Sequence, residues 1–158
     1  MKILLPIDGS PDALNAVRLA LQWASTGLRA EYVLVNVQDP ASLYEMVVAH
    51  DVDRLAALRA EAGAELLQPA EALLDAAGAA YESEVAGGTP APLLLELAEN
   101  YGCQAVMMGA RGMGSPGAGG LGSVALSLLQ HSSLPVTIVR DTADDEAAAA
   151  DDDAPAAD

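Results

Sequence analysis

Apolar residues follow two different patterns along the chain. Short, nearly continuous apolar runs such as Val33-Leu34-Val35 alternate with longer segments in which Leu and Val recur at helical spacing, as at Leu14, Val17 and Leu21. The first pattern indicates strands covered on both faces, and the second indicates amphipathic helices. Together they predict strands over residues 2–7, 31–37, 79–86, 104–108 and 135–140, and helices over residues 11–25, 55–76, 90–100 and 121–131.

Capping and breaking residues support these boundaries. Ser10 is a good N-cap for the first helix, Pro11 suits the first helical position, and Asp12 favours the positive end of the helix dipole. Pro69 falls inside the second predicted helix and should kink it or mark a break. The chain after the second predicted strand gives a weaker pattern, in which Met46-Val47-Val48 fits either a short helix or a loop.

Strands and helices alternate from the first predicted element to the last. This order implies right-handed crossovers and an α/β fold: an open five-stranded, mostly parallel sheet with helices on both faces. We find no internal repeat, so we expect one domain over residues 1–140. From residue 141 the chain is almost entirely Ala and acidic residues, and we expect residues 141–158 to form a disordered tail.

The net charge of −16 narrows the choice of partner. Eight of the 23 acidic residues lie in the last 18 positions, which contain no Lys or Arg. An acidic domain with an acidic tail does not suit a nucleic-acid backbone or an anionic membrane surface. We therefore expect neither nucleic acid nor membrane as a partner.

The sequence also bears on targeting signals, membrane spans, reactive cysteines and metal-binding clusters. No apolar run reaches the roughly 18 residues of a membrane span, and the first six residues read as a strand rather than a secretion signal, so we expect a cytoplasmic protein. The single cysteine, Cys103, is expected to be a small buried or half-buried residue. His50 and His131 are isolated, and no Cys/His cluster has zinc spacing, so we predict no metal site.

Glycines mark the most informative segment. Gly109-Ala110-Arg111-Gly112 follows the fourth predicted strand, and Gly122-Ser123-Val124 opens the helix after it. A strand that ends in glycine and leads into a helix lets the backbone approach a phosphate. In a parallel sheet, ligands bind at the carboxyl ends of the strands, where the strand order reverses. We expect residues from the ends of the first, second and fourth strands to meet there.

The spacing Gly-x2-Gly-x9-Gly-Ser, from Gly109 to Ser123, resembles the nucleotide motif of the universal stress protein family. The resemblance extends over nearly the whole domain, including the opening Lys2-Ile-Leu-Leu-Pro-Ile-Asp-Gly-Ser10 and the closing Leu134-Pro-Val-Thr-Ile-Val139. It implies a Rossmann-like fold that binds an adenine nucleotide, ATP with or without Mg²⁺. It also implies a homodimer formed through the last strand.

Site residues follow from this resemblance position by position. Val37 and Met108 would contact the adenine, and Asp8 would face the ribose or a phosphate-bound metal. The glycines would let the loop close over the ribose and phosphates, while Ser123 would hold phosphate oxygens at the helix N-terminus. The full set is Pro6, Asp8, Val37, Met108, Gly109, Arg111, Gly112, Met113, Gly122, Ser123 and Val124.

Several of these positions also have a purely structural interpretation. The glycine segment could be only a turn, Asp8 could simply cap the first helix, and Ser123 could be an ordinary helix-terminal residue. Arg111 is the sole cation of the loop; it could neutralise a phosphate or equally point to solvent.

Three functions compete. The first is a nucleotide-dependent regulatory or stress-response protein, dimeric, without catalytic residues and with at most slow ATP hydrolysis. The second, an adenylyl-transferring or pyrophosphatase-type enzyme, is disfavoured because the chain is short and has almost no Lys. The third is an interaction module that acts through its dimer surface and acidic tail. Deleting the tail would then alter partner binding while ATP affinity stays nearly intact, whereas a salt-sensitive gain of ATP affinity would indicate electrostatic competition.

Overall fold

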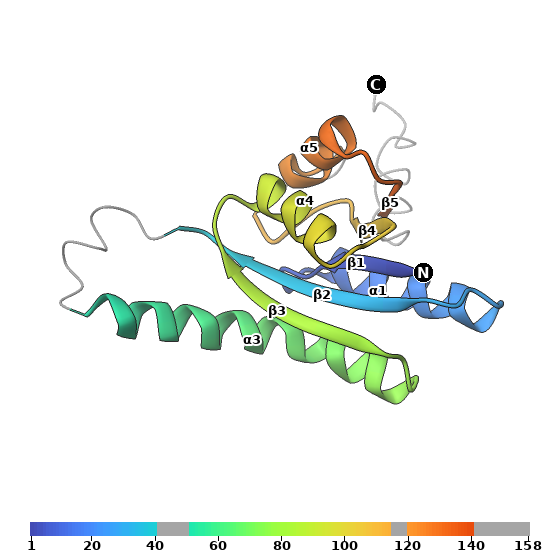
Figure 1. Ribbon diagram of the computed structural model, residues 1–158, viewed down its shortest axis with the longest axis horizontal. Coiled ribbons are helices and arrows are strands. Elements are labelled where there is room, and N and C mark those ends of the chain that lie inside the picture. The colour runs from blue at the N-terminus through green and yellow to red at the C-terminus, as the bar shows by residue number, and fades with distance from the viewer. Residues whose placement is uncertain (41–50, 115–119, 141–158) are drawn as a thin grey trace, which may run out of the picture.

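A computed structural model describes residues 1–40, 51–114 and 120–140 of the chain. Strands and helices alternate in the predicted order (Figure 1). The elements are β1 (Lys2–Pro6), α1 (Pro11–Ser25), β2 (Glu31–Gln38), α3 (Val52–Ala76), β3 (Tyr81–Gly87), α4 (Pro90–Asn100), β4 (Ala105–Gly109), α5 (Ser123–His131) and β5 (Val136–Val139).

The five strands form one parallel sheet in the order β3-β2-β1-β4-β5. The chain moves outward from β1 through β2 to β3, then crosses back to place β4 on the other side of β1. The strand order therefore reverses between β1 and β4. The predicted α/β fold, an open five-stranded sheet with helices on both faces, is confirmed.

Two helices cover each face of the sheet (Figure 1). Side chains of β1 alternate between the faces: Leu5 packs in the core formed with α1 and α3, whereas Leu4 packs in the core formed with α4 and α5. Both cores are largely aliphatic, as the absence of Phe requires. Burial on both faces explains the continuous apolar runs in the strands.

Pro69 does not interrupt its helix. The sequence suggested a kink or a break at this position, but α3 runs unbroken from Val52 to Ala76 with Pro69 inside it. Leu67, Ala70 and Leu74 are buried on both sides of the proline. Their packing against the sheet offsets the roughly 3 kcal/mol that an interior proline costs.

The other differences are small. The strands end within one or two residues of the predicted positions, and α5 begins at Ser123 instead of residue 121. The predictions for Met46-Val47-Val48 and for the tail, residues 141–158, fall outside the described residues. Within the described ranges, none of the helices combines the length and apolarity needed to cross a bilayer.

Candidate functional site

A cavity of about 570 Å³ opens at the carboxyl ends of β1, β2 and β4, where the strand order reverses. This is the position at which open parallel sheets bind ligands. The structure brings every predicted site residue to the lining of this one cavity: Pro6, Asp8, Val37, Met108, Gly109, Arg111, Gly112, Met113, Gly122, Ser123 and Val124.

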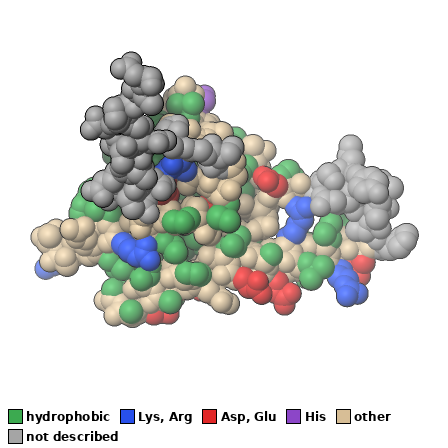
Figure 2. Space-filling view, turned by 180° about the vertical axis from the view of Figure 1, so that it is seen from behind, with side chains coloured by type: hydrophobic (Ala, Val, Ile, Leu, Met, Phe, Trp, Pro, Cys, Tyr) green, Lys and Arg blue, Asp and Glu red, His purple; other side chains and the backbone are tan. Residues whose placement is uncertain are grey.

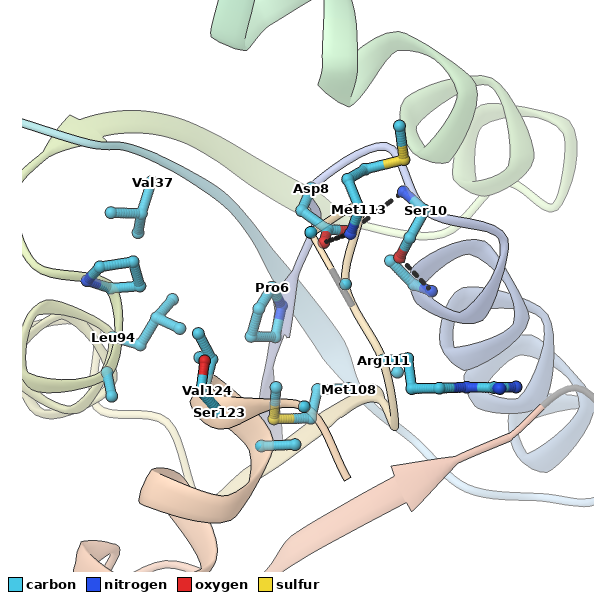
Figure 3. A pocket seen from close by; sticks show the side chains of 18 of the residues that line it. Pro6, Asp8, Ser10, Val37, Leu94, Met108, Arg111, Met113, Ser123 and Val124 are labelled. Carbon is cyan, nitrogen blue, oxygen red and sulfur yellow. Dashed lines mark hydrogen bonds between the residues drawn. The ribbon is translucent and has the colours of Figure 1, made fainter. Parts of the chain in front are cut away.

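One side of the cavity is apolar. Pro6 at the end of β1, Val37 near the end of β2 and Met108 of β4 lie around it, and Leu94 of α4 faces the same space (Figure 3). The first turn of α4 adds to this wall because Pro90 has no backbone N–H to present. A flat, weakly polar group such as a purine ring matches such a surface.

The opposite side presents hydrogen-bond donors. Gly122 is the N-cap of α5 and supplies no side chain to cap the helix, so the first-turn N–H groups, including those of Ser123 and Val124, lack an intrahelical partner. The Gly122 N–H itself donates to the carbonyl of Ala110 at 2.7 Å, which fixes the helix start beside the end of β4. The exposed Ser123 hydroxyl lies at this terminus. The arrangement suits an anionic group.

Asp8 connects two loops at the rim of the cavity (Figure 3). Its Oδ1 accepts a hydrogen bond from the Ser10 N–H at 2.9 Å, and its Oδ2 accepts one from the Met113 N–H at 2.9 Å. A Cβ atom at Gly112 would lie 2.5 Å from that Oδ2, so only glycine fits this approach. The capping of α1 itself is performed by Ser10, whose Oγ accepts from the Ala13 N–H.

Asp12 makes a second connection. Its Oδ2 accepts from the backbone N–H of Arg111 at 3.1 Å and lies 3.5 Å from the Arg111 Nε. The Arg111 side chain extends away from the other labelled lining residues (Figure 3). Gly109 permits this packing, since a Cβ there would lie 2.6 Å from the Asp12 backbone carbon. The structure thus pairs Arg111 with a carboxylate, whereas the sequence suggested a phosphate or solvent.

Sequence reasoning missed several residues of the site. Asp12 was interpreted only through the helix dipole, and Leu94 and Asp39 were not considered, although both line the cavity. The spacing of apolar residues in this helix predicts that Leu94 faces the sheet. Only the strand order shows that α4 covers the end of β2. Asp39, directly after β2, could have been found from its place at a strand end.

Two other reactive side chains of the described residues, Cys103 and His131, lie outside the cavity lining. Cys103 is buried, as expected, and burial raises the pKa of its thiol. The His131 Nδ1 lies 2.8 Å from the Ser127 carbonyl on the same helix. His50 falls outside the described residues. Within the part of the chain that the structure describes, no group of three His, Cys, Asp or Glu side chains could hold a metal.

Known proteins with similar sequences show which family this chain belongs to. The profile of the universal stress protein family matches residues 1–140. The chain belongs to the universal stress protein family. Universal stress protein MJ0531 of Methanocaldococcus jannaschii is 27% identical over 139 residues, which cover 88% of this chain and 81% of that protein. Universal stress protein YxiE of Bacillus subtilis is 30% identical over 146 residues, which cover 88% and 98%.

Solved structures share the fold, and two of the three described here are of universal stress proteins. The protein MJ0577 superposes with a TM-score of 0.76 at 24% identity, covering 89% of this chain and 95% of that one. A universal stress protein in complex with cAMP gives 0.60 at 26% identity, covering 88% and 95%. A family protein of Arabidopsis thaliana with AMP bound gives 0.64 at 17% identity, covering 91% and 94%. Adenine nucleotides are thus bound ligands in two of these relatives.

Proposed function

We propose that this universal stress protein binds an adenine nucleotide in the cavity at the ends of β1, β2 and β4 and acts as a regulatory protein. The observation that carries the proposal is the pairing of an apolar wall with an uncapped helix N-terminus across one cavity. A nucleotide has the same division, since its base is flat and weakly polar and its phosphates are anionic. The cAMP and AMP complexes of two relatives support this assignment.

Each part of the nucleotide has a place in this proposal. The adenine packs against Val37 and Met108, and the phosphate accepts hydrogen bonds from the first turn of α5, with the Ser123 hydroxyl as a further donor. Residues 110–114, directly after β4, lie beside the ribose, and Asp8 holds this segment through the Met113 N–H. Mg²⁺ would have to arrive with the phosphates, because the described residues offer no metal-binding group of their own.

A regulatory role fits the site better than rapid catalysis. A general base needs a carboxylate or imidazole that is available to take a proton. Both carboxylate oxygens of Asp8 already accept backbone hydrogen bonds, which suits holding the loop. We therefore propose at most slow hydrolysis of a bound ATP, with occupancy of the cavity as the signal.

A second copy of the chain is the partner that the sheet edges favour. β5 is an edge strand whose four residues, Val136-Thr137-Ile138-Val139, are all half-buried and uncharged. The opposite edge, β3, carries Glu82 and Glu84, and charges on an edge discourage pairing. We propose that β5 pairs with its copy to form a homodimer.

Isothermal titration of AMP into the full-length protein tests the proposed function. We expect saturable binding at one site per chain. Val37→Asp places a carboxylate in the apolar wall and should weaken binding at least about tenfold, the equivalent of about 1.4 kcal/mol. Val52→Asp is the matched control, because Val52 is 57% exposed on α3 and does not line the cavity. The proposal fails if wild type does not bind AMP or if both variants bind it equally.

A further inference from the structure

The cavity has few positive charges with which to bind phosphates. Among its described lining residues, Asp8 and Asp39 are acidic and Arg111 is the one Lys or Arg. Arg111 is paired with Asp12, which is itself only 5% exposed. Arg59 of α3 lies close to the rim and donates to the main-chain carbonyl of Asp39. The carboxylate of Asp12 thus compensates the positive charge of Arg111 beside the site.

Two further cations of the described chain lie near this end of the sheet, Arg59 at the rim and Arg140 directly after β5, and neither lines the cavity. The sole lysine, Lys2, starts β1 at the opposite end of the sheet and is bonded to Glu82 at 3.0 Å. On the face shown in Figure 2, the Lys and Arg side chains of the described residues lie singly, with no basic patch. Within the described lining, the donors that remain for phosphate are the Ser123 hydroxyl and the N–H groups of one helix terminus, which is equivalent to roughly half an elementary charge.

We propose that this site selects adenine nucleotides by phosphate charge, so that in the absence of divalent metal it binds adenosine monophosphates more tightly than ATP, and that Asp12 sets this preference by compensating Arg111. The inference rests on the proposed function, because it concerns the ligand of the same cavity. Asp12 acts through Arg111 and touches no nucleotide, so it is a specificity-determining positioning residue.

The acidic residues of the site repel ATP more strongly than AMP, because ATP carries more negative charge. AMP carries about two negative charges near neutral pH and ATP about four, since the terminal phosphate has a second pKa near 6. One helix terminus accommodates one phosphate group, so the further phosphates of ATP would lie in a cavity whose described charged lining residues are Asp8, Asp39 and the Arg111 that Asp12 compensates. In a partly buried site such interactions are weakly screened. Bound Mg²⁺ cancels part of the ATP charge and reduces the difference.

Titration calorimetry of the full chain in EDTA at low salt, with adenosine, AMP and ATP, tests the inference. We expect AMP to bind about tenfold more tightly than ATP. The ratio should shrink in about 0.5 M salt, where the Debye length falls well below 10 Å, and also when Mg²⁺ replaces EDTA. ATP binding as tightly as AMP in EDTA at low salt would overturn the inference while the proposed function stands. Failure of both adenosine and AMP to bind would overturn the proposed function, and the inference with it.

Two variants of opposite charge isolate the role of Asp12. Asp12→Asn keeps an oxygen that can accept from the Arg111 N–H but removes the charge; it should raise ATP affinity relative to adenosine about threefold to tenfold. Arg111→Gln should lower the same ratio. Glu99→Gln, an exposed position at the far end of α4, is the matched control and should leave it unchanged. Equal losses for all three ligands in both charge variants would assign Asp12 a purely structural role and contradict the inference.

Discussion

The Oδ2 atom of Asp8 accepts a hydrogen bond from the backbone N–H of Met113 at 2.9 Å, across 105 positions of sequence. This bond joins the end of β1 to the loop after β4, the two segments between which the strand order reverses. With the Asp12–Arg111 contact, it gives the loop two carboxylate anchors on the β1–α1 segment. The loop that would cover a nucleotide is thus positioned by the β1–α1 segment.

Adding a methyl group at Gly112 should break the first anchor. The new Cβ would lie 2.5 Å from the Asp8 Oδ2, so Gly112→Ala should displace that carboxylate from the Met113 N–H. We expect AMP affinity to fall about tenfold and the free energy of unfolding to fall by about 1 kcal/mol. Calorimetry and urea denaturation measure the two effects.

The matched control lies two residues further along the same loop. A Cβ at Gly114 meets no atom of the described residues within 4 Å, so Gly114→Ala should bind AMP as wild type does. Similar losses in both variants would mean that the loop responds to any lost glycine and that the Asp8 contact is unimportant.

Removing residues 141–158 should strengthen ATP binding at low salt. The tail begins two residues after Val139, whose carbonyl accepts from the Ala110 N–H at 2.8 Å in the loop beside the cavity, and it carries eight acidic residues. We expect ATP affinity to rise about threefold to tenfold in the truncated protein, with a smaller gain for AMP, and the gain to fade as salt screens the charges.

A full-length variant whose tail acids are replaced by Asn and Gln separates charge from length. It should reproduce the gain of the truncation. If instead ATP affinity is the same in all three proteins at low salt, the tail does not act on the site, and a role in partner binding becomes the better interpretation.

A charge on β5 should disrupt the proposed dimer. Thr137→Lys would place like charges close together where two copies of the edge strand meet. Light scattering coupled to size exclusion should show a dimer for wild type and a monomer for this variant. Ser83→Lys on β3, the opposite edge, is the control and should remain dimeric. A monomeric wild type at high micromolar concentration would refute the assignment.

Tyr101 gives the fold a distinct alkaline signature. Its hydroxyl donates to the Glu84 Oε2 at 2.6 Å, and this hydrogen bond, with burial, raises the pKa of Tyr101 to about 12 from an ordinary 10.0. Because the folded state favours the neutral phenol, this contribution to stability is complete below pH 10 and is lost as the pH rises through about 12. Tyr101→Phe should lose less stability than wild type over that range, as urea denaturation at each pH can show. Parallel losses in the two proteins would contradict this.

The strand and helix pattern of the sequence was sufficient to predict the architecture and the location of the cavity. Continuous apolar runs indicated a sheet covered on both faces, and Gly109 and Gly112 marked the loop at its end. At Pro69 the sequence predicted a kink or a break, and the structure excludes the break, because Leu67 and Leu74 on either side of the proline pack in the core.

The contact between Asp12 and Arg111 could not be predicted from the sequence. The helical pattern places Asp12 in the first turn of α1, but β4 meets that turn only because it crosses back to lie beside β1. Strand order is decided by packing of the whole sheet, and the ion pair depends on it. Leu94 was missed for the same reason, since α4 reaches the cavity from the other side of the sheet.

Calorimetric titration of adenosine, AMP and ATP into the full-length protein, in EDTA at low salt, is the decisive test of nucleotide binding in this cavity. We expect saturable binding of AMP at one site per chain, weakened at least about tenfold in Val37→Asp and unchanged in Val52→Asp, with ATP binding more weakly than AMP. Absence of any heat of binding for adenosine and AMP would contradict the proposal that the cavity binds an adenine nucleotide.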